Sequence, residues 1–152
     1  MELLRQMKNF TKSKKDKIQI CKTYIRSVLE QSCVVWNYNI SKKRELELER
    51  VQKVAVRLIS DSDNLYQNVL KELNLETLKS RRNKLSEAFA EKCLKNDQNK
   101  VMFKRNKRPH KMVLRNVEKY KIKHARTARL QRSAIIKMTK HLNKKHDEKK
   151  TT

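Results

Sequence analysis

Histidine and cysteine are the residue types in this sequence that could hold a metal ion. His141 and His146 are five residues apart, whereas two ligands stacked on one helix face need a spacing of four. Cys21, Cys33 and Cys93 form neither a CxxC pair nor a zinc spacing with a histidine. The sequence therefore predicts no metal site and no cofactor.

Carboxylates and a possible nucleophile are the next candidates for chemistry. Glu45, Glu47 and Glu49 alternate with leucines in a stretch flanked by arginines. We expect most of them to face solvent and to pair with Lys or Arg on neighbouring turns. Ser32 and Cys33 have no histidine near them in the sequence, although a distant one could fold against them. We therefore expect no catalytic residue and no enzyme activity.

The basic side chains are the feature of this sequence that indicates a function. Lys and Arg number 40 against 16 Asp and Glu, for a formal net charge of +24. Such an excess concentrates polyanions around a protein, which points to DNA, RNA or an anionic membrane surface. Among these we expect nucleic acid as the partner, without a membrane or a small-molecule substrate. Phosphate contacts carry no base preference, so RNA and DNA stay open.

Two clusters could contact phosphate. Arg81, Arg82 and Lys84 lie near the start of a predicted helix, where free backbone N–H groups also attract phosphate. Because adjacent arginines do not share a helix face, one of them could instead anchor an acidic residue such as Glu72. The second cluster lies where few acidic residues compete, and it comprises Lys104, Arg105, Lys107, Arg108, Lys111, Lys119, Lys121 and Lys123. Its alternative role is a solubilising or nuclear-import segment.

Aromatic residues are few, so stacking on single-stranded bases is not expected as a main feature. Tyr120, between Lys119 and Lys121, could still stack on a base. Trp36 is expected to pack in the core.

The elements that position these residues are predicted to be helices. Glycine is absent and Pro109 is the only proline, which disfavours tight hairpin turns and phosphate-cradling loops. Apolar periodicity predicts helices near residues 2–9, 13–39, 42–59, 66–73 and 76–95. Three of these helices are expected to bury a stripe, which comprises Cys21, Tyr24 or Ile25, Val28 and Ser32 in the second, Leu48, Val51, Val54 or Ala55, and Leu58 in the third, and Leu78, Leu85 and Phe89 in the fifth. Ser13 and Ser41 are expected to cap two of them. We therefore expect an all-α protein, a small bundle of about five helices followed by a basic, partly disordered C-terminal tail.

Charge divides the chain into two parts. Residues 1–95 hold 21 basic and 12 acidic residues, net +9, whereas residues 96–152 hold 19 and 4, net +15. Most apolar periodicity lies in the first part. We expect a helical bundle over 1–95 and a basic tail over 96–152. The tail is expected to carry a short helix near 133–143 and to be disordered from residue 144 onward.

Cysteine usage and hydropathy bear on location. Three cysteines without close spacing are typical of reduced, packed thiols in an intracellular protein. No signal peptide is visible, and the longest apolar run covers only residues 33–36. We expect a nuclear or cytoplasmic protein that is not secreted and does not span a membrane.

Several segments resemble one family. YIRSVLEQSCVVWN (24–37), LERVQKVAVRLI (48–59), LNLETLKSRRNKL (73–85) and FAEKCLKN (89–96) follow one another in order. They resemble the region after the palm in non-LTR, LINE-type (jockey- or CR1-like) retrotransposon reverse transcriptases. Residues 115–143 resemble the end of the same reading frames. Gln31 departs from the pattern, where an aromatic residue is common.

The resemblance implies a thumb and post-thumb region that helps to grip a template–primer duplex. The family's Tyr-x-Asp-Asp motif is missing, since Ile25, Arg26 and Ser27 follow Tyr24. Without paired carboxylates for two metal ions, such a fragment cannot copy nucleic acid by itself. The alternatives are a helical protein-interaction module with a nuclear-import tail, and a non-functional retroelement relic.

Overall fold

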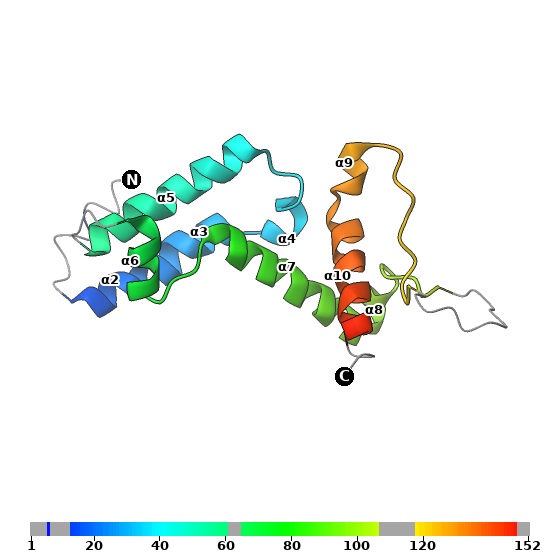
Figure 1. The fold of residues 1–152 in the computed structure, drawn as a ribbon. Helices are drawn as coiled ribbons and strands as arrows, with labels where there is room; N and C mark the ends of the chain where they lie inside the picture. Colours follow the sequence, from blue (N-terminus) through cyan, green and yellow to red (C-terminus); the bar gives the residue numbers. More distant parts are fainter. Residues whose placement is uncertain (1–5, 7–12, 61–64, 107–117, 149–152) are drawn as a thin grey trace. The chain divides into compact units, whose positions relative to one another are not determined.

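Helices make up most of the part described by the computed structural model, which comprises residues 6, 13–60, 65–106 and 118–148 (Figure 1). Within these ranges there is no strand, and one isolated bridge joins Arg105 to Tyr120. The expected all-α class is thereby confirmed. The helix expected near 2–9 falls almost entirely outside the described residues. Contacts divide the chain into two units: unit 1 is Met1–Cys33 with Ile40–Asn83, and unit 2 is Val34–Asn39 with Lys84–Thr152.

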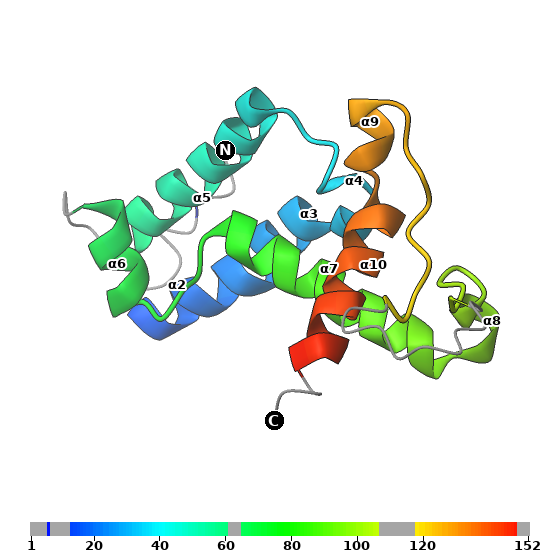
Figure 2. The ribbon, with the colours of Figure 1, turned by 45° about the vertical axis from the view of Figure 1, so that its right-hand side comes forward.

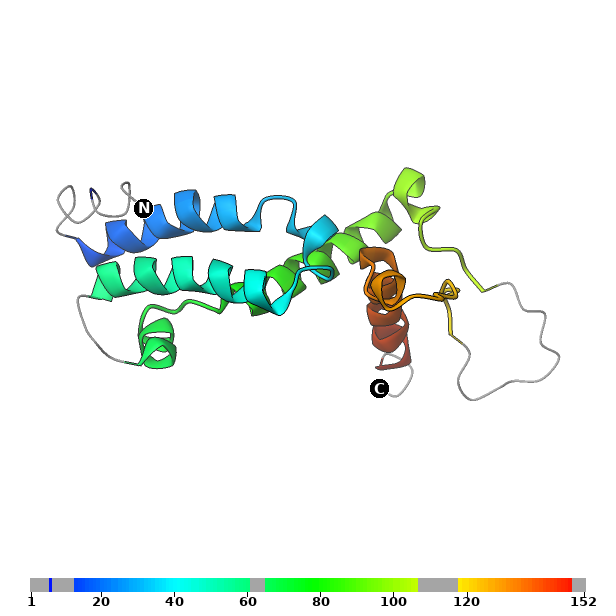
Figure 3. The same cartoon turned by 90° about the horizontal axis from the view of Figure 1, so that it is seen from above.

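Unit 1 is built on two neighbouring rods. The first consists of α2 (Lys14–Ile20), the π-helical turn η1 (Cys21–Ile25) and α3 (Arg26–Glu30). It runs beside α5 (Lys42–Ser60), as seen in Figure 3, and α6 (Tyr66–Glu72) packs on α5. The helix expected over 13–39 therefore ends at residue 30, before the short α4 (Cys33–Trp36). The core of unit 1 contains Cys21, Ala55, Val56, Ile59, Val69, Leu70, Leu73 and Leu75.

The π-helical turn changes which residues of the first rod are buried. Its i→i+5 bonding places residues five apart on one face, and the N–H of Arg26 accordingly donates to the carbonyl of Cys21. Cys21 and Arg26 are buried, whereas Tyr24 and Val28 are 65 % and 71 % exposed. The expected inward position of Val28 was therefore wrong, and of the alternatives Tyr24 and Ile25 it is Ile25 that packs against the core.

The buried face of α5 also differs from the expected one. Leu48, Val51 and Leu58 are only half-buried and Val54 is exposed. The fully buried positions are Gln52, Ala55, Val56 and Ile59. Ala55 is thus confirmed as the inner of the alternatives Val54 and Ala55, whereas apolar periodicity missed Gln52, a polar residue with partners inside unit 1.

In this glycine-free chain, a polar side chain caps the start of α5, and a residue in the left-handed backbone conformation terminates α6. The N–H of Arg44 donates to Ser41 Oγ over 3.3 Å, which confirms the expected cap of α5, whereas Ser13 makes no side-chain cap. Asn74 follows α6 with φ 52°, a conformation that Gly usually supplies. The N–H groups of Asn74 and Leu75 then donate to the carbonyls of Lys71 and Leu70, which closes a Schellman turn.

Unit 2 holds the second half of α7 (Leu78–Lys95), α8 (Asp97–Lys100), two extended segments, α9 (Ala128–Gln131) and α10 (Ala134–Glu148). α10 crosses α7 within this unit, as seen in Figure 2. The core comprises Ala90, Cys93, Phe103, Tyr120, Met138 and Leu142. On α7 itself, Phe89 was expected to face inward and is 40 % exposed.

The last helix is longer than its sequence predicts. It continues to Glu148, so residues 144–148, expected to be disordered, are helical. Lys145 forms an ion pair with Glu91 of α7, and this contact stabilises the last turns of α10. The composition changes at residue 95, whereas the contacts change between residues 83 and 84, inside α7.

Candidate nucleic-acid interface

Arg82, predicted to contact phosphate, lies inside unit 1. Its side chain is 0 % exposed, and its Nη2 atom is 3.9 Å from Glu45 Oε1. Glu45 is also paired with the exposed Lys79, at 3.2 Å. The prediction for Arg82 was therefore wrong, because α7 turns this side chain toward α5. A buried guanidinium needs a counter-charge, and α5 supplies it.

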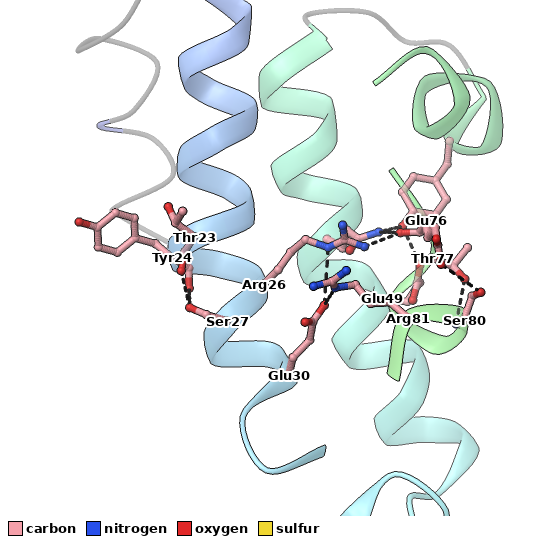
Figure 4. A network of polar contacts seen from close by, with 12 residues as sticks. Thr23, Tyr24, Arg26, Ser27, Glu30, Glu49, Glu76, Thr77, Ser80 and Arg81 are labelled. Atoms are coloured by element: carbon pink, nitrogen blue, oxygen red, sulfur yellow. Dashed lines mark hydrogen bonds and ion pairs between the residues drawn. The ribbon is translucent and has the colours of Figure 1, made fainter. Parts of the chain in front are cut away.

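Arg81 is engaged in a second ion pair of unit 1. Its Nε atom lies 2.6 Å from Glu30 Oε1 at the end of α3, and the Nε of Arg26 lies 3.8 Å from the same oxygen. Figure 4 shows both guanidinium groups reaching Glu30. The expectation that an arginine here anchors an acidic residue is confirmed for both, although Glu72 pairs with Lys14 instead. Arg81 is about half exposed and keeps part of its surface for solvent.

The same network orders the chain that enters α7. Arg26 Nη2 and Gln52 Nε2 both donate to the carbonyl of Glu76, over 2.7 and 3.0 Å. Gln52 also donates to the hydroxyl of Tyr66, which donates to Glu49 over 2.6 Å. Burial, together with the Glu49 carboxylate, raises the pKa of Tyr66. These polar groups are structural, since each is directed at another part of unit 1.

The glutamates of α5 follow the sequence expectation only in part. Glu47 pairs with Arg44 one turn away, at 3.2 Å, as expected. Glu45 and Glu49 instead bind groups distant in sequence. At the start of α7 the N–H of Ser80 donates to Thr77 Oγ1, so this helix terminus is already capped.

Five of the predicted phosphate-binding residues come together in unit 2, on two antiparallel extended segments, 103–106 and 118–123. The N–H of Asn106 donates to the carbonyl of Lys119 over 2.9 Å, and the N–H of Lys121 donates to the carbonyl of Lys104 over 2.8 Å. We call these two stretches the paired segments. They carry Lys104, Arg105, Lys119, Lys121 and Lys123, which the sequence separates by up to 19 positions.

Asn143 of α10 fixes the position of the paired segments. Its Oδ1 accepts a hydrogen bond from the N–H of Tyr120 over 2.9 Å, and its Nδ2 donates to the carbonyl of Tyr120 over 3.0 Å. One buried side-chain amide thus binds both backbone groups of Tyr120, as a neighbouring strand would. Asn143 was not predicted as a functional residue; its signal in the sequence is a lone polar residue in the apolar stripe of a helix.

The basic side chains of the paired segments line open hollows. Lys104 and Lys121 border a hollow of about 960 Å³ together with Arg105, Asn106 and Glu118. They also border a small one of about 40 Å³ with Lys123, over a floor that includes Ile136. Lys104, Arg105, Lys121 and Lys123 are exposed, and none of them pairs with a carboxylate of the described residues.

The remaining predicted site residues divide as follows. Lys107, Arg108 and Lys111 lie outside the described residues. Lys84 is exposed on α7, in the half that belongs to unit 2. Tyr120, which the sequence leaves as a residue that could stack on a base, is 7 % exposed in the core of unit 2, so only a small part of its surface is open. Trp36, expected in the core, is half-buried.

The basic residues next to the paired segments are more numerous than those predicted as phosphate contacts. Residues 119–146 contain no Asp or Glu and ten Lys or Arg. On α10, Lys137, Lys140 and Lys144 are exposed at three- and four-residue spacing, which places them on one helix face. The absence of acidic residues over this stretch was the signal that could have found them.

The cysteines are free and buried, as expected for packed thiols. Burial raises the pKa of the thiols of Cys21 and Cys93, which keeps them in the unreactive protonated form. Among the described residues no group of His, Cys, Asp or Glu is arranged to hold a metal ion. In that same part of the chain, no helix combines the length and apolar character needed to cross a membrane.

Comparison with protein-family models, curated proteins and solved structures finds no match to this chain.

Proposed function

We propose that this chain binds nucleic acid through its phosphates, with the paired segments as the main contact surface. We further propose that it corresponds to the thumb and post-thumb region of a LINE-type reverse transcriptase, lacks the catalytic palm, and is no enzyme by itself. The nucleus, or else the cytoplasm, is the compartment that this role implies.

The observation that carries the proposal is the convergence of four exposed cations on the paired segments. Lys104 and Arg105 face solvent beside Lys121 and Lys123, without carboxylate partners in the described chain. Lysines with no acidic partner keep their full charge for phosphate, and each contact releases counterions from the nucleic acid. The acid-free stretch 119–146 extends the same charge along unit 2.

The test is the salt dependence of binding by the full chain, measured by fluorescence anisotropy on a duplex and on a single strand. If six or more phosphates are contacted, affinity should fall by about three orders of magnitude between 50 and 200 mM salt. Replacing Lys104, Arg105, Lys121 and Lys123 by Gln should lower the slope of log K against log salt by about 3 to 4 on a duplex.

A matched control removes the same charge from unit 1. Lys22, Lys42, Lys43 and Arg50 are exposed there, and replacing all four by Gln should leave the slope close to that of the unaltered chain. If the slope of log K against log salt falls equally in both variants, then the total charge of the chain, and not the paired segments, attracts nucleic acid. A flat salt dependence of the unaltered chain would refute phosphate-driven binding.

A protein-interaction role is a second candidate because unit 1 exposes an apolar pair. Tyr24 and Val28 lie four residues apart and are 65 % and 71 % exposed. A stable protein complex that survives nuclease treatment, and that Tyr24→Ser with Val28→Ser disrupts, would favour this role. Loss of the complex on nuclease treatment would favour nucleic-acid binding.

A further inference from the structure

Unit 2 contains a further hollow, distinct from the two that Lys104 and Lys121 border. It has a volume of about 260 Å³ and lies where α7, α10 and the start of segment 118–123 meet. Three kinds of residue line it. The apolar ones are Leu94, Tyr120 and Leu142, the basic ones are Lys95, Lys119, Lys145 and His146, and Glu91 is the acidic one.

The charges around this hollow are only partly balanced. Glu91 forms an ion pair with Lys145, and its Oε1 also lies 3.8 Å from His141 Nε2. The interaction with Lys145 lowers the pKa of Glu91, so the carboxylate stays charged and bound to α10. Lys95 and Lys119 form no ion pair with a described residue, which leaves two ammonium groups of the lining for an anion.

The apolar lining lies next to these cations. The Nζ atom of Lys119 is 5.8 Å from the centre of the Tyr120 ring. Leu94 and Leu142 complete the lining from α7 and α10. A ligand that matches this pattern has a flat or apolar part joined to an anionic group.

We propose that this hollow binds one unpaired nucleotide, with its base against Leu94 and the small open parts of Tyr120 and Leu142, and its phosphate near Lys95 and Lys119. The volume of about 260 Å³ is below the range of about 300 to 1,000 Å³ of sites that enclose a drug-sized ligand, so it leaves room for no more than one nucleotide and excludes a duplex. This proposal deepens the proposed function, since it names the part of a nucleic acid that enters unit 2.

The direct test uses adenosine monophosphate, adenosine and inorganic phosphate in NMR titrations of the isotope-labelled full chain. The monophosphate should bind about tenfold more tightly than either of the other two, because only it uses both the apolar lining and the cations. The resonances that shift should be those of Leu94, Tyr120 and Leu142. Phosphate binding as tight as the monophosphate would indicate an anion site only and would overturn the proposal, as would shifts confined to other residues.

Lys95→Gln should weaken binding of the monophosphate several-fold. Lys92→Gln is the matched control, because Lys92 is exposed on the same helix and does not line the hollow. Equal effects of the two substitutions, or none from Lys95→Gln, would overturn the proposal.

A second experiment distinguishes failure of this inference from failure of the proposed function. A blunt duplex and the same duplex with one unpaired 3′ nucleotide are compared by anisotropy, and the overhang should bind more tightly only while Lys95 is present. Salt-dependent binding of both duplexes with equal affinity would leave the proposed function standing and overturn the nucleotide site. Binding of the monophosphate in the hollow without binding of either duplex would leave the nucleotide site standing and overturn the proposed function.

Discussion

Arg82 and Lys79 contact the same carboxylate from very different surroundings. Both pair with Glu45, but the side chain of Arg82 is 0 % exposed, whereas that of Lys79 is 64 % exposed. Removing a buried charged partner costs about 3 to 5 kcal/mol, whereas exposed pairs contribute about 1 kcal/mol or less. We therefore expect Arg82→Ala to lower the free energy of unfolding by about 3 kcal/mol and Lys79→Ala by less than 1 kcal/mol, as measured by urea denaturation.

The nucleic-acid affinity of Arg82→Ala shows whether Arg82 only stabilises the fold or also contacts phosphate. Measured at a temperature where the variant is still folded, Arg82→Ala should bind with the affinity of the unaltered chain. A variant that keeps its stability but loses affinity would show that Arg82 reaches solvent and phosphate after all.

Tyr66 makes the stability of unit 1 depend on alkaline pH. Burial and the adjacent Glu49 carboxylate raise the pKa of its phenol above the ordinary value of about 10. The folded chain keeps this proton at a pH where the unfolded chain has lost it. The contribution is therefore fully present below about pH 10 and is lost as the pH rises above that value.

Tyr66→Phe removes this titration. The difference in unfolding free energy between the unaltered chain and Tyr66→Phe should thus shrink between pH 9 and pH 11, as followed by circular dichroism. Tyr24→Phe is the control, because Tyr24 is exposed and makes no contact with Glu49. A difference that stays constant over this range would mean that the phenol is not held as a donor to Glu49.

At the scale of elements, one side chain of α10 holds the paired segments. Asn143→Leu leaves the buried N–H and carbonyl of Tyr120 without their partners, and each such loss costs about 1 to 3 kcal/mol. Because Lys119 and Lys121 flank Tyr120, the substitution should weaken nucleic-acid binding as well as unit 2. Hydrogen exchange of the Tyr120 amide should accelerate markedly.

Thr139→Val gives a matched control on the same helix. Thr139 is buried too, but its hydroxyl donates only to the carbonyl of Ile135 within α10. This substitution should cost about 1 kcal/mol or less and leave the exchange of Tyr120 unchanged. If Asn143→Leu leaves that exchange slow, the paired segments have another support.

Sequence periodicity predicts the long helices of this chain well, because their apolar residues recur at local spacings. Helix α5 begins and ends within one residue of its expected bounds, and Ser41 caps it as expected. The buried face of α5 was missed at Gln52, whose partners Tyr66 and Glu76 are distant in sequence. Local patterns carry no information on such partners.

The candidate site was predicted in composition but not in geometry. Basic residues near 104 and 121 could be named from charge alone, yet their pairing depends on backbone hydrogen bonds and on Asn143. Arg82 shows the opposite error, since a charged residue is buried once α5 supplies Glu45. Charge density thus finds a basic surface, whereas burial decides which of its residues can reach a phosphate.

At the scale of the whole molecule, the net charge of +24 acts on folding and on binding with opposite signs. Like charges repel one another in the folded chain, and salt screens this repulsion with a Debye length of about 10 Å at 0.1 M. Ion pairs such as Arg44–Glu47 are screened too, but exposed pairs of this kind contribute little. We therefore expect the midpoint of thermal unfolding to rise between 20 and 300 mM NaCl, while nucleic-acid affinity falls.

This opposition gives the binding experiment an internal check, because affinity lost at high salt cannot then result from unfolding. The variant with Gln at Lys22, Lys42, Lys43 and Arg50 has a net charge of +20 instead of +24, so its midpoint of thermal unfolding should rise less steeply with salt. Melting curves followed by circular dichroism measure both slopes. A midpoint that falls with salt would mean that specific ion pairs outweigh the net repulsion, and the losses of affinity would then have to be measured at a fixed fraction of folded chain.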